Sequence, residues 1–464
     1  MSTRTAAIAL TRFGMGARPA EIAAIAQDPQ GALQSHLDAP EPLDAAGLKS
    51  GAEAAAESFA YFARRRERLR QNTNQDGVYD PDTDENFPED TRREIGRLVR
   101  ATLGQEVSAR TRHAMTTPTG FHERLVRFWS NHFTVAATTA QTLAITGPYE
   151  REAIRPHVTG RFADLLSAVV RHPGMLVYLD NIFSVGPNSR AGRRIGRGLN
   201  ENLAREILEL HTLGVDGGYD QADVEAFARA LTGWSVGNPR FGQARMGQFV
   251  FAAPLHEPGP QTVLGKRYAE DGEAQAQAIL DDLARHPATA RTVATKLARH
   301  FIADAPPAGA IARLEAVFLE TDGDLKALSL ALLDEDAAWD QALSKMKTPE
   351  EFFLSAGRAL DIPTLRPEAL TGVYRALGQR PFGAPSPKGW PDDAESWAGP
   401  DALMKRLEWS SAAAQRVGGR DPKAWLDTAL GPLASEATRL AVSRAESREQ
   451  GLTLALMSPE FQRR

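Results

Sequence analysis

The sequence predicts an all-α fold: a single large domain over residues 1–464, built of many helices, with a small β-hairpin around 248–264. Apolar residues recur at spacings of three and four along most of the chain, which is the period of an amphipathic helix. No repeat of fixed period and no low-complexity linker divides the chain. With 42% hydrophobic and 24% charged residues, the composition is that of a globular protein with a sizeable core.

Five segments carry the clearest helical periodicity, and residues that start or end helices bound them. Their apolar stripes cover 121–129, 162–169, 199–213, 224–231 and 293–301. Pro287 lies in the first turn of the last of these helices, where a helix tolerates proline. Gly214 directly follows the third stripe and suits a helix C-cap. We therefore expect long helices in these five places.

Other segments interrupt this pattern. Residues 71–89 are polar and acidic, with many Asn, Asp and Pro, and predict a mobile insertion over or near a cleft. Residues 184–198 form a glycine-rich loop with four arginines, and 381–400 form a loop rich in Pro, Gly and Trp. Residues 248–253 alternate in polarity and predict a strand that pairs with 262–264 as the hairpin.

Charge and composition exclude several classes of protein. The net charge of -5 provides no general attraction to nucleic acid, so we expect no nucleic-acid partner. No apolar run approaches the ~20 residues that a membrane span needs. The absence of cysteine excludes disulfides, thiol nucleophiles and Cys-ligated metals. As written, the N-terminus carries no signal peptide and predicts a cytoplasmic protein; a chain whose export signal had been removed would be periplasmic or exported.

Three polar residues fall on apolar helix faces. On a helical wheel, Glu206 lies inside the stripe of 199–213, and His132 lies inside that of the helix from Phe121. His300 lies beside Val293, with Lys296 one turn before it. A buried carboxylate costs several kcal/mol unless it is paired, hydrogen-bonded or protonated. Taken singly, each is more often a satisfied polar residue of the core; together, they are candidates for one shared site.

Two chemistries fit such a site. If a divalent metal is bound, His132, Glu206 and His300 are the candidate ligands, and the metal would activate water. Without a metal, a desolvated Glu206 can act as general acid or base, and Glu209 or Asp180 could supply the second carboxylate that glycoside chemistry uses. Two alternatives therefore remain for the cofactor: the site binds one divalent metal, or it binds none. The candidate catalytic residues are Glu206, His132, His300, Glu209 and Asp180.

Further polar and aromatic residues are candidates for substrate binding. Asn202 flanks the stripe of 199–213, and the tryptophans Trp234 and Trp390 stand beside Gly or Pro, where an indole could stack on a sugar ring. His256 lies on the loop after the predicted strand, and loops on a rigid scaffold often carry function. The substrate-binding candidates are Asn131, Asn202, Arg205, Trp234, His256 and Trp390.

At this point the residues match a known family. The run GLNENLAREILELHTLGVDGGY, over 198–219, resembles the hallmark segment of the family called domain of unknown function 1800. Other runs agree with it, among them RFWSNHF from Arg127, ARALTGW from Ala228, KLARHF from Lys296 and PKGWP from Pro387. The resemblance extends over nearly the whole chain, and His132, Glu206 and His300 all lie inside matching runs. The family offers no catalytic residues to carry over.

The resemblance implies a bacterial protein, often encoded beside a family that is similar to sulfatases and alkaline phosphatases. Two functions follow as alternatives. The first is an enzyme, a hydrolase or lyase, acting on a polar or saccharide-like polymer or small molecule through the Glu and His cluster. The second is a non-catalytic binding or assembly module that partners a sulfatase-like protein. A metal-dependent redox enzyme that uses the same residues is a third, weaker alternative.

Overall fold

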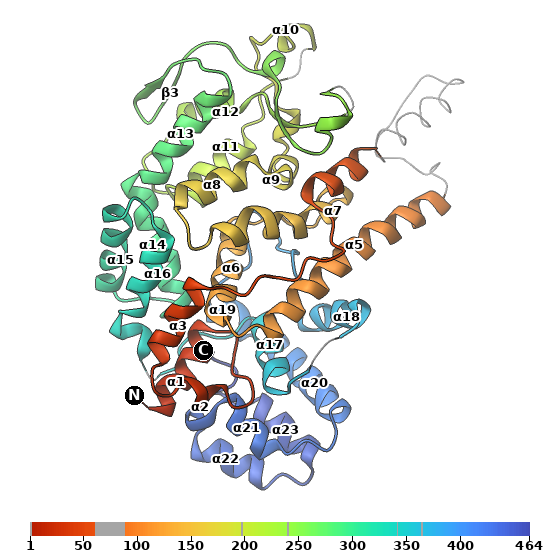
Figure 1. Ribbon diagram of the computed structural model, residues 1–464, viewed down its shortest axis with the longest axis vertical. Helices are drawn as coiled ribbons and strands as arrows, with labels where there is room; N and C mark the ends of the chain where they lie inside the picture. Colours follow the sequence, from red (N-terminus) through yellow and green to blue (C-terminus); the bar gives the residue numbers. More distant parts are fainter. Residues whose placement is uncertain (1, 61–88, 196–197, 239–240, 341, 363–364) are drawn as a thin grey trace.

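The computed structural model describes residues 2–60, 89–195, 198–238, 241–340, 342–362 and 365–464. The first third of the chain contributes helices of which those over 89–132 cross the middle of the molecule (Figure 1). They are α1 (Thr3–Ile8), α2 (Glu21–Ile25), α3 (Pro29–Asp38), α5 (Glu89–Thr116), α6 (Gly120–His132) and α7 (Ala140–Tyr149).

The central part of the chain forms a helical layer with two short hairpins attached. Its helices are α8 (Phe162–Arg171), α9 (Pro173–Tyr178), α10 (Gly192–Ile195), α11 (Asn202–Glu206), α12 (Gln221–Leu231), α13 (Glu273–Arg285), α14 (Pro287–Phe301), α15 (Ala308–Glu320) and α16 (Leu325–Leu333). The strands are β1 (Trp234–Val236), β2 (Phe249–Phe251), β3 (Gln261–Val263) and β4 (Lys266–Tyr268).

The last part of the chain is helical again and packs at the other end of the molecule (Figure 1). Its helices are α17 (Pro349–Ala359), α18 (Pro367–Leu377), α19 (Ala394–Trp397), α20 (Pro400–Arg416), α21 (Pro422–Ala429), α22 (Glu436–Ser443) and α23 (Arg448–Leu456). The prediction of a mostly helical fold with small β-hairpins is therefore confirmed.

The described residues pack into two hydrophobic cores. The larger core includes the buried faces of α6, α8, α12 and α14, and the smaller one joins α17, α21 and α23 to α1 and α5. Phe13, Phe121 and Phe301 meet in the larger core with ring centroids 5.7 to 5.9 Å apart. Trp339 packs against both cores. Helix α6 is buried at every residue from Gly120 to Trp129, so the surrounding helices hold it firmly in place.

The strand prediction was right in kind but wrong in pairing. Strand β2 pairs with β1, not with 262–264, and β3 pairs with β4. The second hairpin turns through Leu264 and Gly265, which both have positive φ, as a two-residue hairpin turn of type I′ requires. Trp234 of β1 is fully buried against Phe249 of β2, so burial of these rings favours that pairing.

The stripe expected over 199–213 is not one α-helix. Helix α11 begins only at Asn202 and passes after Glu206 into a π-helical segment, Ile207–His211. A π-helix has wider turns than the 3.6-residue α-helix and frequently occurs at functional sites. Side chains beyond Glu206 therefore point in directions that a uniform 100° wheel does not give.

The predicted loops have mixed outcomes. Residues 71–88 of the predicted acidic insertion lie outside the described residues, and Glu89 begins α5. The glycine- and arginine-rich segment 184–198 contains the short helix α10, and its residues 196–197 lie outside the described part. Within the segment 381–400, the helical residues are those of α19 and Pro400, which begins α20.

Candidate functional site

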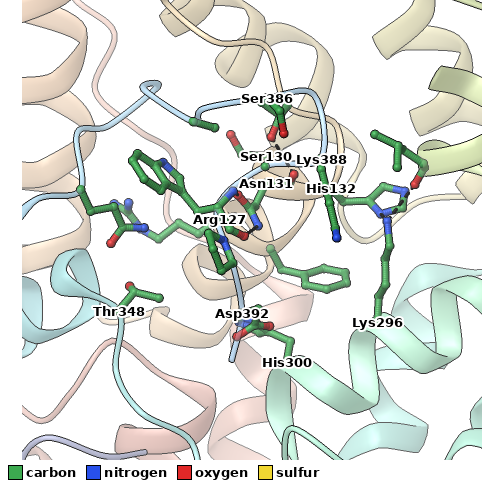
Figure 2. A pocket seen from close by; sticks show the side chains of 18 of the residues that line it. Arg127, Ser130, Asn131, His132, Lys296, His300, Thr348, Ser386, Lys388 and Asp392 are labelled. Carbon is green, nitrogen blue, oxygen red and sulfur yellow. Dashed lines mark hydrogen bonds and ion pairs between the residues drawn. The ribbon is translucent and has the colours of Figure 1, made fainter. Parts of the chain in front are cut away.

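A cavity of about 770 Å³ lies where the C-terminal end of α6, the π-helical segment, α14 and the segment before α19 meet. Apolar side chains, among them Phe128, Leu210 and Phe382, form part of its wall. Charged and uncharged polar side chains form most of the rest, and Figure 2 shows Arg127, Lys296, Lys388 and Asp392 around the same space. A cavity of this size with a few convergent polar groups is the common form of a small-molecule site.

The segment before α19 is fixed to the end of α6 by one asparagine. The side chain of Asn131 accepts a hydrogen bond from the backbone N–H of Trp390 at 2.8 Å and donates one to the backbone carbonyl of Trp390 at 3.0 Å. Gly389 has a φ of +86°, and a Cβ there would lie 2.5 Å from the backbone oxygen of Asn131. Only glycine allows this close approach, which holds Lys388 at the cavity.

The π-helical segment delivers two backbone carbonyls to the site. The last carbonyls of a helix have no partner within the helix, and other groups must satisfy them. Here the carbonyl of Leu210 accepts a hydrogen bond from Lys296 at 2.8 Å, and that of His211 bonds His132 at 3.1 Å. The end of this helix thus connects α6 with α14.

Lys296 is the unusual group of the cavity. It projects from α14, and its Nζ contacts the carbonyl oxygen of Leu210 and, at 3.2 Å, the Nδ1 of His132. Neither acceptor carries a negative charge. Among the described residues no carboxylate forms an ion pair with Lys296, although Glu209 lines the same cavity. A partly buried amine without a counter-ion is costly to keep protonated.

Two further cations lie at this side of the cavity. Lys388 and Arg299 are exposed at the rim, and within the described part of the chain neither forms an ion pair. In Figure 2 the side chain of Lys388 extends from its loop toward the part of the cavity that holds Lys296. Burial, and then the charges of Lys388 and Arg299, lower the pKa of Lys296 from 10.5 to about 8. We call Lys296, Lys388 and Arg299 the cationic corner.

The contacts of His132 fix its tautomer. A backbone carbonyl can only accept, so Nε2 carries the proton and donates to His211, while Nδ1 accepts from Lys296. Burial, and then the charge of Lys296, lower the pKa of His132 well below 6.5. His132 is therefore neutral, with both ring nitrogens occupied, and it positions Lys296.

His300 lines the cavity from the same helix but belongs to a different network. Its Nδ1 donates to Asp392 at 2.8 Å, and the Asp392 carboxylate also contacts Lys345 at 3.2 Å and Arg464 at 3.5 Å. The ring centroid lies 5.3 Å from that of Phe128, which in turn lies 6.5 Å from that of His132. Burial lowers the pKa of His300. His300 therefore forms part of the cavity wall and holds the segment around Asp392 in place.

Two acidic residues of the cavity wall, Glu350 and Glu351, are neutralised by arginines. Glu350 pairs with Arg110 and with Arg127, the latter at 2.6 Å, and Glu351 pairs with Arg124 and, at 2.9 Å, with Arg464. Nearly all of these side chains are buried. Breaking one partner of a buried ion pair typically costs several kcal/mol. These ion pairs therefore have a structural role, whereas the cations of the cationic corner are unpaired among the described residues.

We expected His132, Glu206 and His300 to share one pocket, and for Glu206 this expectation is wrong. Both histidines line the cavity, but Glu206 does not. Glu206 is half-buried, and in the described part of the chain it forms no ion pair. Burial, and then the nearby charge of Glu209, raise its pKa. The expectation of a mostly buried, bonded Glu206 is wrong: the wheel assumed one α-helix over 199–213, whereas α11 covers only Asn202–Glu206.

The metal site expected from these three residues is therefore not formed. In the part of the chain that the structure describes, no group of three or more His, Asp or Glu residues is placed to hold a metal ion. Two of the three candidate ligands are already committed, since His132 bonds Lys296 and His300 bonds Asp392. A metal ion could bind through these two nitrogens only after both hydrogen bonds had broken.

The other candidates divide into two groups. Glu209, Asn131 and Trp390 line the cavity. Five do not, namely Asp180, Asn202, Arg205, Trp234 and His256.

Each of these five has an ordinary structural place. Arg205 pairs with Glu201 at 2.8 Å on the surface. Trp234 is fully buried, and His256 is buried with Nδ1 donating to the backbone carbonyl of Thr232 at 2.8 Å. Asp180 and Asn202 are exposed away from the cavity.

Lys296, Lys388 and Arg299 were missing from the predicted site. Lys296 could have been found, because it lies one turn before His300 on the same helix face. Lys388 and Arg299 are ordinary surface residues by sequence, and only the fold brings them beside Lys296.

Comparison with known proteins identifies a family and gives no activity. A family model described as a protein of unknown function, DUF1800, matches residues 8–463. No curated protein and no solved structure matches the chain. Among the described residues, no helix has both the length and the apolar character needed to cross a membrane.

Proposed function

We propose that this chain, which belongs to the DUF1800 family, is an enzyme that binds an anionic, polar substrate in the cavity and acts on it through the Lys296 amine. One observation carries the proposal. The Nζ of Lys296 is held by two uncharged acceptors in a cavity where the neighbouring charges are positive. An anionic ligand would supply the missing negative charge, because carboxylate, sulfate and phosphate all accept charged hydrogen bonds.

The chemistry of the amine favours a lyase over a hydrolase. A neutral amine has two N–H groups and one lone pair. The carbonyl of Leu210 and the Nδ1 of His132 take the two hydrogens, which leaves the lone pair for the substrate. A lysine whose pKa is lowered toward neutrality is suited to removing a proton from a bound substrate, which is the first step of an elimination.

The functions predicted from the sequence alone agree with this site to different degrees. Hydrolysis through Glu206 has less support, because that carboxylate does not line the cavity. A saccharide-like substrate that carries acidic groups fits the cationic corner. A non-catalytic module that partners a sulfatase-like protein is the second candidate, and it would leave Lys296 without a chemical role.

Calorimetric titration tests the proposal with probes that differ only in charge. Galacturonate, glucose 6-phosphate and a sulfated monosaccharide are each compared with the neutral parent sugar. We expect at least one anion to bind better than its parent, and binding to weaken about tenfold in Lys388→Ala, or about 1.4 kcal/mol. Lys326→Ala is the matched control, because Lys326 pairs with Asp38 on the surface. Equal binding of anions and neutral sugars would contradict the proposal.

A further inference from the structure

We infer that the Lys296 amine forms a reversible covalent imine with a substrate that carries both a carbonyl group and an anionic group, such as a 2-oxo acid. The inference rests on the proposed function and names the substrate class of the same cavity. It depends on the placement of Nζ, on the charges around it and on the walls of the cavity.

The two contacts of Nζ leave it free for attack on carbon. Nζ donates to the Leu210 carbonyl and to the His132 ring, and both acceptors belong to the rigid ends of neighbouring helices. A lysine that is paired with a carboxylate is kept as an ammonium and is a poor nucleophile. Lys296 has no such partner among the described residues, while Lys326 and Lys345 do.

The neighbouring cations serve both binding and reactivity. Burial is the largest cause that lowers the pKa of Lys296, and the charges of Lys388 and Arg299 lower it further, to about 8. Desolvation together with a second cationic group is a recognised way of activating a Schiff-base lysine. The same two cations would hold the anionic group of the substrate beside the amine.

The apolar part of the wall favours the condensed product. Phe128 and Leu210 line the cavity next to His132 and Lys296. An imine forms with loss of water and returns to the carbonyl when water adds again, so a wall that limits water near Nζ shifts the balance toward the imine.

The step balances without an oxidant or reductant. The Nζ lone pair forms a bond to the carbonyl carbon as the C=O π bond breaks, and one of the two Nζ hydrogens passes to the oxygen, which becomes a hydroxyl group. An acid gives that hydroxyl a second proton, the C–O bond breaks, water leaves, and a protonated imine remains. Its one N–H can still donate to Leu210 or His132. Glu209 lines the cavity and precedes Leu210, which makes it the candidate to give and receive the proton.

Reductive trapping tests the inference on the full chain. The chain is incubated with pyruvate and cyanoborohydride at pH 8, and the modified lysine is found by peptide mass mapping. We expect Lys296 to be labelled at least tenfold faster than Lys326, and the rate to fall about tenfold in Lys388→Ala. Lys296→Arg should lose the label at this position, and Lys326→Arg should keep it. Equal labelling of surface lysines, or no label on Lys296, would overturn the inference.

Lactate separates failure of the inference from failure of the proposed function, because it carries the same carboxylate without the carbonyl. If lactate binds by calorimetry and binding depends on Lys388, while pyruvate is not trapped, the covalent step is wrong and the anionic site stands. If lactate does not bind and pyruvate is not trapped, the inference is wrong, and the titration with the anionic sugars then decides whether the proposed function stands. Should Lys296→Arg fail to fold, the dependence of trapping on exposed Lys388 still decides the matter.

Discussion

Two buried histidines that lie side by side show how differently the same side chain can be used. The rings of His132 and His211 are 6.2 Å apart, and both are buried. His132 has a partner for each ring nitrogen, whereas neither ring nitrogen of His211 has a hydrogen-bond partner among the described residues. Burial, and then the charge of Lys296, lower the pKa of His211 to about 3. His211 serves the site through its backbone carbonyl, not through its ring.

Replacement of each ring by phenylalanine should therefore have opposite effects on stability. We expect His211→Phe to raise the free energy of unfolding by about 1 kcal/mol, because it removes an unsatisfied buried donor and acceptor. We expect His132→Phe to lower it by about 1 to 3 kcal/mol, because Lys296 and the His211 carbonyl lose their partner. Urea unfolding measures both. A loss of stability in His211→Phe as large as that in His132→Phe would show that the His211 ring has a partner.

At the same scale, sequence could identify which residues are unusual but not what they contact. His132 and His300 stand out as polar residues on apolar faces, and both do line the cavity. Their partners come from 79 and 92 residues away, and no local pattern indicates them. Lys296 carries a weak signal because a lysine on an inner helix face is usually explained by a solvated end of its long side chain.

The helical elements were predictable where they are regular. Helices α6, α8, α12 and α14 lie over the expected periodic segments, because each has one continuous apolar face and clear end signals. The segment 199–213 was misread because the wheel assumes one helix geometry throughout. The chain is α-helical only over Asn202–Glu206 and π-helical over Ile207–His211. Glu206 does not line the cavity, and the carbonyls of Leu210 and His211 are bonded to Lys296 and His132, partners that no local pattern indicates.

The segment before α19 should be sensitive at Gly389. Both Gly389 and Gly378 have a φ near +86°, so alanine meets the same backbone strain of about 1 kcal/mol at either position. At Gly389 the new Cβ would also lie 2.5 Å from the backbone of Asn131, while at Gly378 it meets only the end of Lys405 at 3.9 Å. We expect Gly389→Ala to be the more destabilising and to displace Lys388 and Trp390.

The binding readout makes this comparison specific. Gly389→Ala should weaken anion binding in the calorimetric titration, and Gly378→Ala should leave it unchanged. If the two variants lose the same stability and bind alike, the segment is not held by its contact with Asn131.

For the whole molecule, the global charge gives a misleading impression of the ligand. The chain carries a net charge of -5, yet the carboxylates Glu350 and Glu351 in the cavity are neutralised by arginines, and the cationic corner is not neutralised. Local potential in a cleft, not net charge, attracts a ligand. The sequence predicted the helical architecture because that depends on local period. The positive charge of the cationic corner could not be predicted, because it arises from residues that α14 and the segment before α19 bring together.

The central claim is that the fold keeps the Lys296 amine reactive, and its titration tests this most directly. The rate of acylation of Lys296 by a limiting amount of reagent is measured from pH 6 to pH 11 by peptide mass mapping, in the folded chain and in urea. The deprotonated amine reacts, so the rate rises as the pH passes through the pKa. We predict a midpoint at about 8 in the folded chain and near the ordinary value of about 10.4 in urea. The same midpoint in both states would contradict the account.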